Sequence, residues 1–207
     1  MLFFDLDGTI TDTNMLWLDV DKDFLGRRGL PYTSEYQQKI AHCIFNTAAT
    51  YTKELFSLPE SEEEIKAEWM ELAHKHYKTA ALKPHAEEYL RLLHGKGHRL
   101  GIITACMPEL LETVLKNRGI YDLFEIIVYT NELGYEKRRP EPYLFAAEKA
   151  GVEIFDCVMF EDSPVAAAGA VEAGMKVVGV YDGYYAPRRA EMESICHKYI
   201  ESFSELM

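Results

Sequence analysis

The sequence predicts an α/β protein in which a doubly wound parallel sheet is interrupted by an all-helical insertion. Apolar segments at residues 125–129, 157–160 and 176–180 alternate with helical segments that end at glycine, which is the pattern of a parallel α/β sheet. Residues 14–80 lack this alternation and have a helical pattern instead. A chain of 207 residues is long enough for one such domain with a modest insertion.

The first expected strand covers residues 2–4, which are too apolar and too few for anything but a strand buried on both faces. Asp5 and Asp7 follow at once. Ligands of open α/β sheets bind beyond the carboxyl ends of the strands, and residues two apart in an extended chain emerge on the same side. The two acids therefore indicate a candidate site, against the plainer alternative that they only end a strand and cap a turn.

Two close carboxylates must share a proton or bind a cation. Mg²⁺ suits this position, because it prefers one or two carboxylate ligands and leaves its other positions for water and a substrate phosphate. Gly8 permits a tight turn, and Thr9 offers a hydroxyl and an N–H group to an anion. The segment 5–9 therefore predicts a magnesium-dependent phosphoryl-transfer site.

The insertion carries its own helix signals. Ser61 and Glu64 form a capping box, and Ile65 with Trp69 begins an apolar face at helical spacing. The apolar residues around Trp17 indicate an earlier helix. This segment is therefore expected to be helical throughout.

Pro84 marks the return to the sheet domain. We therefore expect a core domain at residues 1–13 and 81–207 and an inserted helical domain at 14–80. From Ala186 onward the chain is expected to form a helix with an acidic tail.

Two more apolar segments end in residues suited to a phosphate or a metal ion. One ends at Thr104, and Pro108 then begins a helix, so that free N–H groups between them could also face an anion. The other runs into Glu161 and Asp162, and Ser163 is placed as the N-cap of the following helix. The plainer reading is that these two acids only favour the positive end of that helix.

The segments 5–9, 100–104, 136–145 and 157–164 resemble, in this order, the four motifs of the haloacid dehalogenase (HAD) superfamily. The resemblance covers the whole chain. It implies that this chain has the Rossmann-like core of the family. It also implies that Asp5 is the nucleophile.

The resemblance also implies the roles of other residues. Asp7 would be the general acid and base, and Thr104 with the adjacent Ala105 would bind the transferring phosphoryl group. The implied metal site contains Asp5, Asp7 and Asp162, with Glu161 either an alternate ligand or a group that supports the ligands. Gly8 and Thr9 would contact the substrate phosphate.

The family's third motif supplies a cation before a Pro-x-Pro segment, and here two candidates stay open. Counting back from Pro140 and Pro142 favours Arg139, whereas counting forward from Gly134 favours Lys137. Either could balance Asp5 and the phosphate, although a guanidinium and an ammonium group differ in geometry and hydration.

The insertion matches the helical cap of one HAD subclass, which includes phosphoglycolate phosphatases and β-phosphoglucomutase. Such a cap would exclude water and select the substrate by closing. The stretch around Asn46 lies about where the family's specificity loop would be, so Asn46 is a candidate substrate-binding residue. A plain helix or interhelical loop is an equal alternative there.

The predicted function is Mg²⁺-dependent hydrolysis of a small phosphorylated metabolite, such as a sugar phosphate or a phosphoglycolate-like compound, through an aspartyl-phosphate. Asp7 favours phosphate esters, because family members with other chemistry generally have another residue there. A phosphosugar mutase is the main alternative, since it shares every motif. A binding or regulatory protein on an inactive HAD fold is a third possibility.

Composition excludes some partners. The formal net charge of −12 disfavours nucleic acids and anionic membranes. A phosphorylated substrate is repelled by the same charge, so the positive charge must be local. We expect a monomer or homodimer.

The four cysteines have no metal-like spacing, which favours reduced thiols in the cytoplasm. Cys106 is expected to pack or line the site rather than act as a nucleophile. No signal peptide or membrane span is expected.

Overall fold

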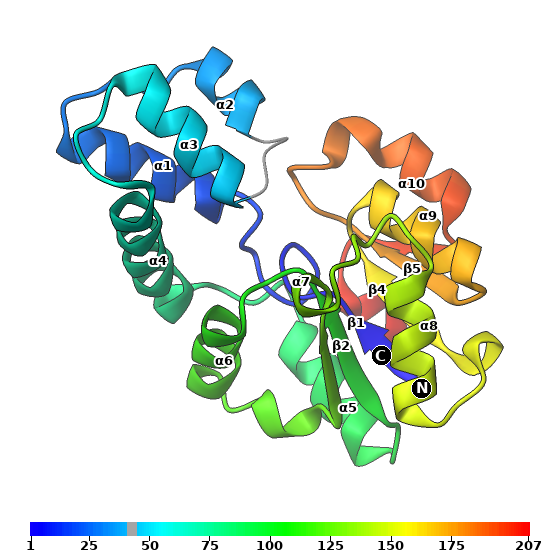
Figure 1. Cartoon of the computed structure of the whole chain (residues 1–207). Coiled ribbons are helices and arrows are strands. Elements are labelled where there is room, and N and C mark those ends of the chain that lie inside the picture. Colours follow the sequence, from blue (N-terminus) through cyan, green and yellow to red (C-terminus); the bar gives the residue numbers. More distant parts are fainter. Residues whose placement is uncertain (41–44) are drawn as a thin grey trace. The chain divides into compact units, whose positions relative to one another are not determined.

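The computed structural model describes residues 1–40 and 45–207 (Figure 1). The chain divides into two compact units, one made of Met1–Asn14 with Ala80–Met207 and the other of Met15–Thr79. The first unit contains the sheet and the second is helical. Each unit is described by itself.

The sheet of the first unit has six parallel strands in the order β3-β2-β1-β4-β5-β6. The strands are β1 (Leu2–Phe4), β2 (Leu100–Thr104), β3 (Ile126–Tyr129), β4 (Val158–Glu161), β5 (Lys176–Val180) and β6 (Lys198–Ile200). The expected doubly wound parallel sheet is thus confirmed, with β1 central between β2 and β4. The carboxyl ends of these three strands meet at one edge of the sheet.

Six helices connect the strands of this unit. They are α5 (Ala86–Gly95), α6 (Pro108–Asn117), α7 (Thr130–Leu133), α8 (Glu141–Ala150), α9 (Pro164–Ala173) and α10 (Arg189–Ile195). Short 3₁₀ turns lie at Tyr121–Leu123, Ile154–Asp156, Ala186–Arg188 and Phe203–Leu206.

The two faces of the sheet bury different side chains, because successive residues of a strand point to opposite faces. Phe3 and Met159 lie in the core that also contains apolar residues of α8, α9 and α10. Phe4 and Phe160 stack at 4.4 Å on the other face, where the ring of Phe203 also packs. Both faces are therefore covered, as the apolar sequence of the strands requires.

The C-terminal segment differs from its expected structure. Helix α10 ends at Ile195, and Lys198–Ile200 then forms the edge strand β6. Gly179 of β5 explains this packing, because a Cβ there would overlap the Tyr199 ring. The expectation of one continuous helix was wrong, since Lys198–Ile200 contains a charged residue and lacks the continuous apolar run that residues 2–4 have.

The second unit contains α1 (Leu16–Arg27), α2 (Ser34–Ile40), α3 (Phe45–Phe56) and α4 (Glu62–Thr79). Helix α4 packs against α1 and α3, and the Trp69 ring lies 5.5 Å from Phe24 and 5.8 Å from Phe45. The Ser61–Glu64 capping box is present, with Ser61 N–H donating to the Glu64 carboxylate at 2.7 Å and Glu64 N–H donating to Ser61 Oγ at 3.2 Å.

Asp21 of α1 is a buried carboxyl group in this unit. Burial raises its pKa to about 7, although a hydrogen bond from Tyr36 lowers it in part. The Tyr36 hydroxyl also lies 2.9 Å from Thr52 Oγ1. Because the folded state binds this proton more tightly than the unfolded state, unfolding free energy falls as pH rises from about 4 to about 7.

Asp21→Asn is expected to remove this pH-dependent fall in the free energy of unfolding. At pH 8 the free energy of unfolding should therefore rise by up to about 4 kcal/mol. Both tryptophans, Trp17 and Trp69, lie in this unit, so urea unfolding followed by tryptophan fluorescence at pH 5 and pH 8 measures the effect. Asp19→Asn is the matched control, because Asp19 is an exposed residue of the same helix. An Asp21→Asn protein no more stable at pH 8 than the control protein would contradict the prediction.

Candidate active site

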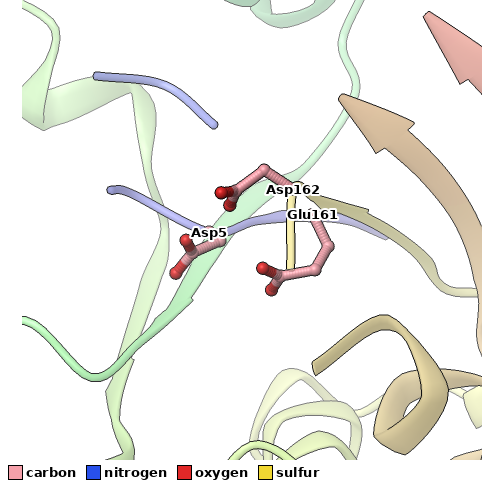
Figure 2. Close-up of side chains that lie close together, drawn as sticks. All are labelled: Asp5, Glu161 and Asp162. Atoms are coloured by element: carbon pink, nitrogen blue, oxygen red, sulfur yellow. The ribbon is translucent and has the colours of Figure 1, made fainter. Parts of the chain in front are cut away.

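Three carboxylates converge at the carboxyl ends of β1 and β4 (Figure 2). Asp5 follows β1, Glu161 ends β4 and Asp162 follows it. One oxygen of each lies within 4.8 Å of the others, and all three residues are buried. The sheet itself sets this geometry, since Asp5 N–H donates to Phe160 O at 2.9 Å and so extends the pairing of β1 with β4.

Lys137 brings a positive charge to this group. Its Nζ lies 2.7 Å from Asp5 Oδ1 and 2.5 Å from Glu161 Oε2. Burial alone would lower the pKa of Lys137, but the carboxylates of Asp5 and Glu161 raise it well above its usual value. The ammonium group is therefore charged and bridges two acids from neighbouring strands.

The backbone of Lys137 is fixed by α8 and α9. The Tyr143 hydroxyl donates to Lys137 O at 2.9 Å and to Ala166 O at 2.8 Å. Gly169 of α9 lies so close that a Cβ there would overlap the Lys137 carbonyl oxygen. Tyr143 and Gly169 thus position the cation.

The two candidate cations are now distinguished by position. Arg139 is exposed, and its N–H donates to Glu136 O at 3.0 Å in a turn. Arg138 is also exposed and pairs with Glu136. The structure brings Lys137 to Asp5 and leaves Arg139 at the surface, because the turn at 136–139 points successive side chains in different directions.

Asp162 is held by two donors. Thr9 Oγ1 donates to Oδ1 at 3.0 Å, and Asn14 Nδ2 donates to Oδ2 at 2.6 Å. Burial raises the pKa of Asp162 well above its usual value, and the negative charges of Glu161 and Asp5 raise it further. This carboxylate is therefore oriented by two neutral donors.

Thr9, expected to contact a substrate anion, makes two hydrogen bonds within the protein, and the anion contact stays a prediction. Its hydroxyl donates to Asp162, and its N–H donates to Leu6 O at 3.3 Å. Gly8 does make the expected tight turn, with φ of +81°, and a Cβ there would overlap Asn14 and Asp162. The N–H of Gly8 donates to Thr11 O at 2.7 Å. Both residues thus build the loop that holds Asp162.

Asp7 lies outside the three-carboxylate group. Its carboxylate accepts a hydrogen bond from Thr13 Oγ1, and Thr13 in turn lies 2.7 Å from Thr11 Oγ1. Thr11 donates to Leu6 O at 3.0 Å. Among the described residues the cluster that could hold an ion contains Asp5, Glu161 and Asp162, and a metal-binding role for Asp7 stays a prediction.

Thr104, at the end of β2, is fully buried. Its Oγ1 accepts a hydrogen bond from Cys106 N–H at 3.0 Å, a bond that does not use the hydroxyl proton. Ala105 is exposed beside it, and its carbonyl accepts from Asn131 Nδ2 at 2.6 Å. Asn46 belongs to α3 of the other unit, and its side chain lies outside the described residues.

The charges of the site fit a divalent cation. Three buried carboxylates face one ammonium group, so the site carries a net negative charge if all are ionised. Both Glu161 oxygens and both Asp162 oxygens accept hydrogen bonds, but Glu161 is paired with the charged ammonium of Lys137, whereas the side chains that donate to Asp162 are neutral. Asp5 and Asp162 are therefore the better placed ligands, and oxygen donors of this kind suit Mg²⁺.

Comparison with known proteins places the chain in a family. The sequence model of the family described as haloacid dehalogenase-like hydrolase matches residues 2–180. The chain therefore belongs to the haloacid dehalogenase-like hydrolases, and the family predicted from its motifs is confirmed.

Curated relatives include several phosphatases. The putative phosphatase YhcW of Bacillus subtilis is 29% identical over 182 residues, which cover 86% of this chain and 81% of the relative. The probable pseudouridine-5'-phosphatase of Drosophila melanogaster is 30% identical over 185 residues, which cover 86% of this chain and 80% of the relative.

Solved structures share the fold. A putative β-phosphoglucomutase from Thermotoga maritima has a TM-score of 0.82 at 23% identity and covers 99% of this chain and 95% of its own. A predicted phosphoglycolate phosphatase from Haemophilus somnus has a TM-score of 0.81 at 22% identity, with 100% and 95% coverage. Identities this low establish the architecture alone.

No helix among the described residues has the length and apolar character needed to cross a membrane.

Proposed function

We propose that the protein is a Mg²⁺-dependent phosphatase that hydrolyses a small phosphorylated metabolite through an aspartyl-phosphate. The observation that carries this proposal is the position of Asp5 at the end of the central strand. There its carboxylate contacts Lys137 and lies within 4.8 Å of carboxylate oxygens of Glu161 and Asp162.

The metal ion would be held by Asp5 and Asp162, with Glu161 supporting Lys137. When bound, Mg²⁺ would neutralise part of the charge that Asp5, Asp162 and the substrate phosphate place together. The hydrogen bonds from Thr9 and Asn14 fix the direction of the Asp162 oxygens, which favours one site geometry.

The reaction begins with Asp5. Its carboxylate oxygen attacks phosphorus in line, and the bond between phosphorus and the leaving oxygen breaks. Asp7 gives its proton to that oxygen as it leaves. Lys137 keeps Asp5 oriented and balances its charge, and the Thr104 hydroxyl donates to the transferring phosphoryl group.

The second half of the reaction frees the enzyme. Asp7, now ionised, accepts a proton from a water molecule that attacks the phosphorus of the aspartyl-phosphate. The bond between phosphorus and Asp5 breaks, and inorganic phosphate leaves. Asp7 thereby regains its proton, so the cycle closes.

The names of the relatives support a small substrate. They include a pseudouridine-5'-phosphatase, a hexitol phosphatase and phosphoglycolate phosphatases. We therefore propose a phosphorylated sugar, sugar alcohol or short acid as the substrate class. Location in the cytoplasm, the absence of a nucleic-acid partner and a monomeric or dimeric state stay predictions.

A panel of phosphorylated metabolites tests the proposal. We expect Mg²⁺-dependent release of inorganic phosphate from at least one sugar phosphate and from para-nitrophenyl phosphate, and its loss when EDTA removes the metal. Isomerisation of a sugar phosphate without net phosphate release would instead identify a mutase. A folded protein that hydrolyses none of these compounds at any metal concentration would contradict enzymatic function on phosphate esters.

A further inference from the structure

A second buried ion pair lies in the same unit, outside the three-carboxylate group. Lys83 Nζ donates to Asp182 Oδ2 at 2.8 Å, and both side chains are more than nine-tenths buried. The mechanism above uses neither residue. Lys83 precedes α5 and Asp182 follows β5, so the pair joins two segments far apart in the sequence.

The backbone of Lys83 is bonded to the loop that carries Asp7. Lys83 N–H donates to Ile10 O at 2.9 Å, and Asp12 N–H donates to Ala81 O at 2.9 Å. A β-bridge between Thr11 and Leu82 lies between these two bonds. Residues 10–12 and 81–83 thus form one small antiparallel element.

This antiparallel element is connected by hydrogen bonds to Asp7, the general acid of the proposed mechanism. Thr11 lies 2.7 Å from Thr13 Oγ1, which donates to the Asp7 carboxylate. The position of Thr13, and with it the direction of Asp7, therefore depends on where residues 10–12 are held.

Asp182 links the Lys83 side chain to the turn that follows β5. Its Oδ1 accepts from Tyr184 N–H at 2.8 Å, which closes a turn directly after β5. Strand β5 pairs with β4, with Gly179 opposite Glu161, so this turn begins next to the end of β4 that carries Asp162. This turn is therefore anchored beside the metal-binding end of β4.

We propose that Lys83 is a positioning residue for the general acid: through Asp182 it ties residues 10–13 to the turn after β5 and so keeps Asp7 aimed at the leaving oxygen. The inference rests on the proposed function. It concerns one step, in which Asp5 bonds to phosphorus, the leaving oxygen separates, and the proton of Asp7 moves to that oxygen.

The dependence of rate on the leaving group tests this role. Phenolate needs protonation by a general acid more than nitrophenolate does, because it is the stronger base. The quantity to measure is the ratio of kcat/KM for phenyl phosphate to kcat/KM for para-nitrophenyl phosphate, with Mg²⁺ present. The kcat/KM value covers only the steps through transfer to Asp5, so later water attack does not affect it.

Lys83→Met is expected to lower this ratio by about tenfold, a part of the 10²- to 10⁴-fold that a positioned acid contributes. Asp7→Asn calibrates the assay and should lower the ratio further. Lys116→Met is the matched control, because it removes an exposed ion pair with Glu112, and it should leave the ratio unchanged.

The double variant Lys83→Met, Asp182→Asn keeps the test valid if the single variant does not fold. It removes the unpaired buried carboxylate and should regain thermal stability while the lowered ratio persists. The inference would be overturned if folded Lys83→Met lost kcat/KM equally on phenyl phosphate and para-nitrophenyl phosphate. It would also be overturned if the double variant had the wild-type ratio of these two kcat/KM values. Failure of the wild-type protein to hydrolyse either ester would instead contradict the proposed function.

Discussion

Replacing Asp5 with Asn is expected to abolish turnover, with a loss of at least about 10⁴-fold in kcat. The amide has nearly the shape of the carboxylate, and its oxygen can still accept a hydrogen bond from Lys137, but its oxygen is a poor nucleophile. The amide is also neutral, so it binds a cation next to Asp162 more weakly than the carboxylate does. The loss should therefore come from chemistry rather than from unfolding.

Phosphate release measures this effect, with thermal unfolding of the same protein as a check on its fold. Asp122→Asn is a suitable control, because Asp122 is an exposed residue of the turn before β3. The control should retain wild-type activity. Retention of more than a few per cent of activity by Asp5→Asn would exclude Asp5 as the nucleophile.

Lys137→Met is expected to lower kcat by about 10²- to 10³-fold, as is typical when one preorganised charge-stabilising group is lost. The substitution leaves Asp5 and Glu161 without their shared cation at 2.7 Å and 2.5 Å. Buried acids left unpaired in this way also destabilise the fold. The melting temperature without metal should therefore fall as well.

Arg139→Met is the matched control for this variant. Arg139 is exposed and lies two residues along the same turn, so we expect activity within about twofold of wild type. Initial rates on para-nitrophenyl phosphate at saturating Mg²⁺ compare the two variants. A larger loss for Arg139→Met than for Lys137→Met would reverse the assignment of the cation.

Five of the six strands could be predicted because their segments are apolar, and three of these strands run into chemistry-bearing residues. Asp5, Thr104 and Asp162 follow buried strands, and a parallel sheet places such strand ends at one edge. Strand β6 could not be predicted, because Lys198–Ile200 contains a charged residue and follows a helix. Its pairing depends on Gly179, whose lack of a side chain admits the Tyr199 ring.

The supporting residues of the site were harder to predict. Asn14 donates to Asp162 across 148 positions of sequence, and no local pattern signals such a contact. The choice between Lys137 and Arg139 depended on the turn at 136–139, which sets the direction of each side chain. The hydrogen bond from the Thr9 hydroxyl to Asp162 could not be predicted either, and the anion contact expected for Thr9 stays a prediction.

Peptide mapping of the protein after a single turnover identifies the residue that receives the phosphoryl group. The protein would be mixed with a labelled phosphate ester and Mg²⁺, quenched in acid and digested. The account predicts an acyl-phosphate on Asp5 that forms only when the metal is present. A label on another residue, or phosphate release at full rate with no labelled peptide at any quench time, would contradict it.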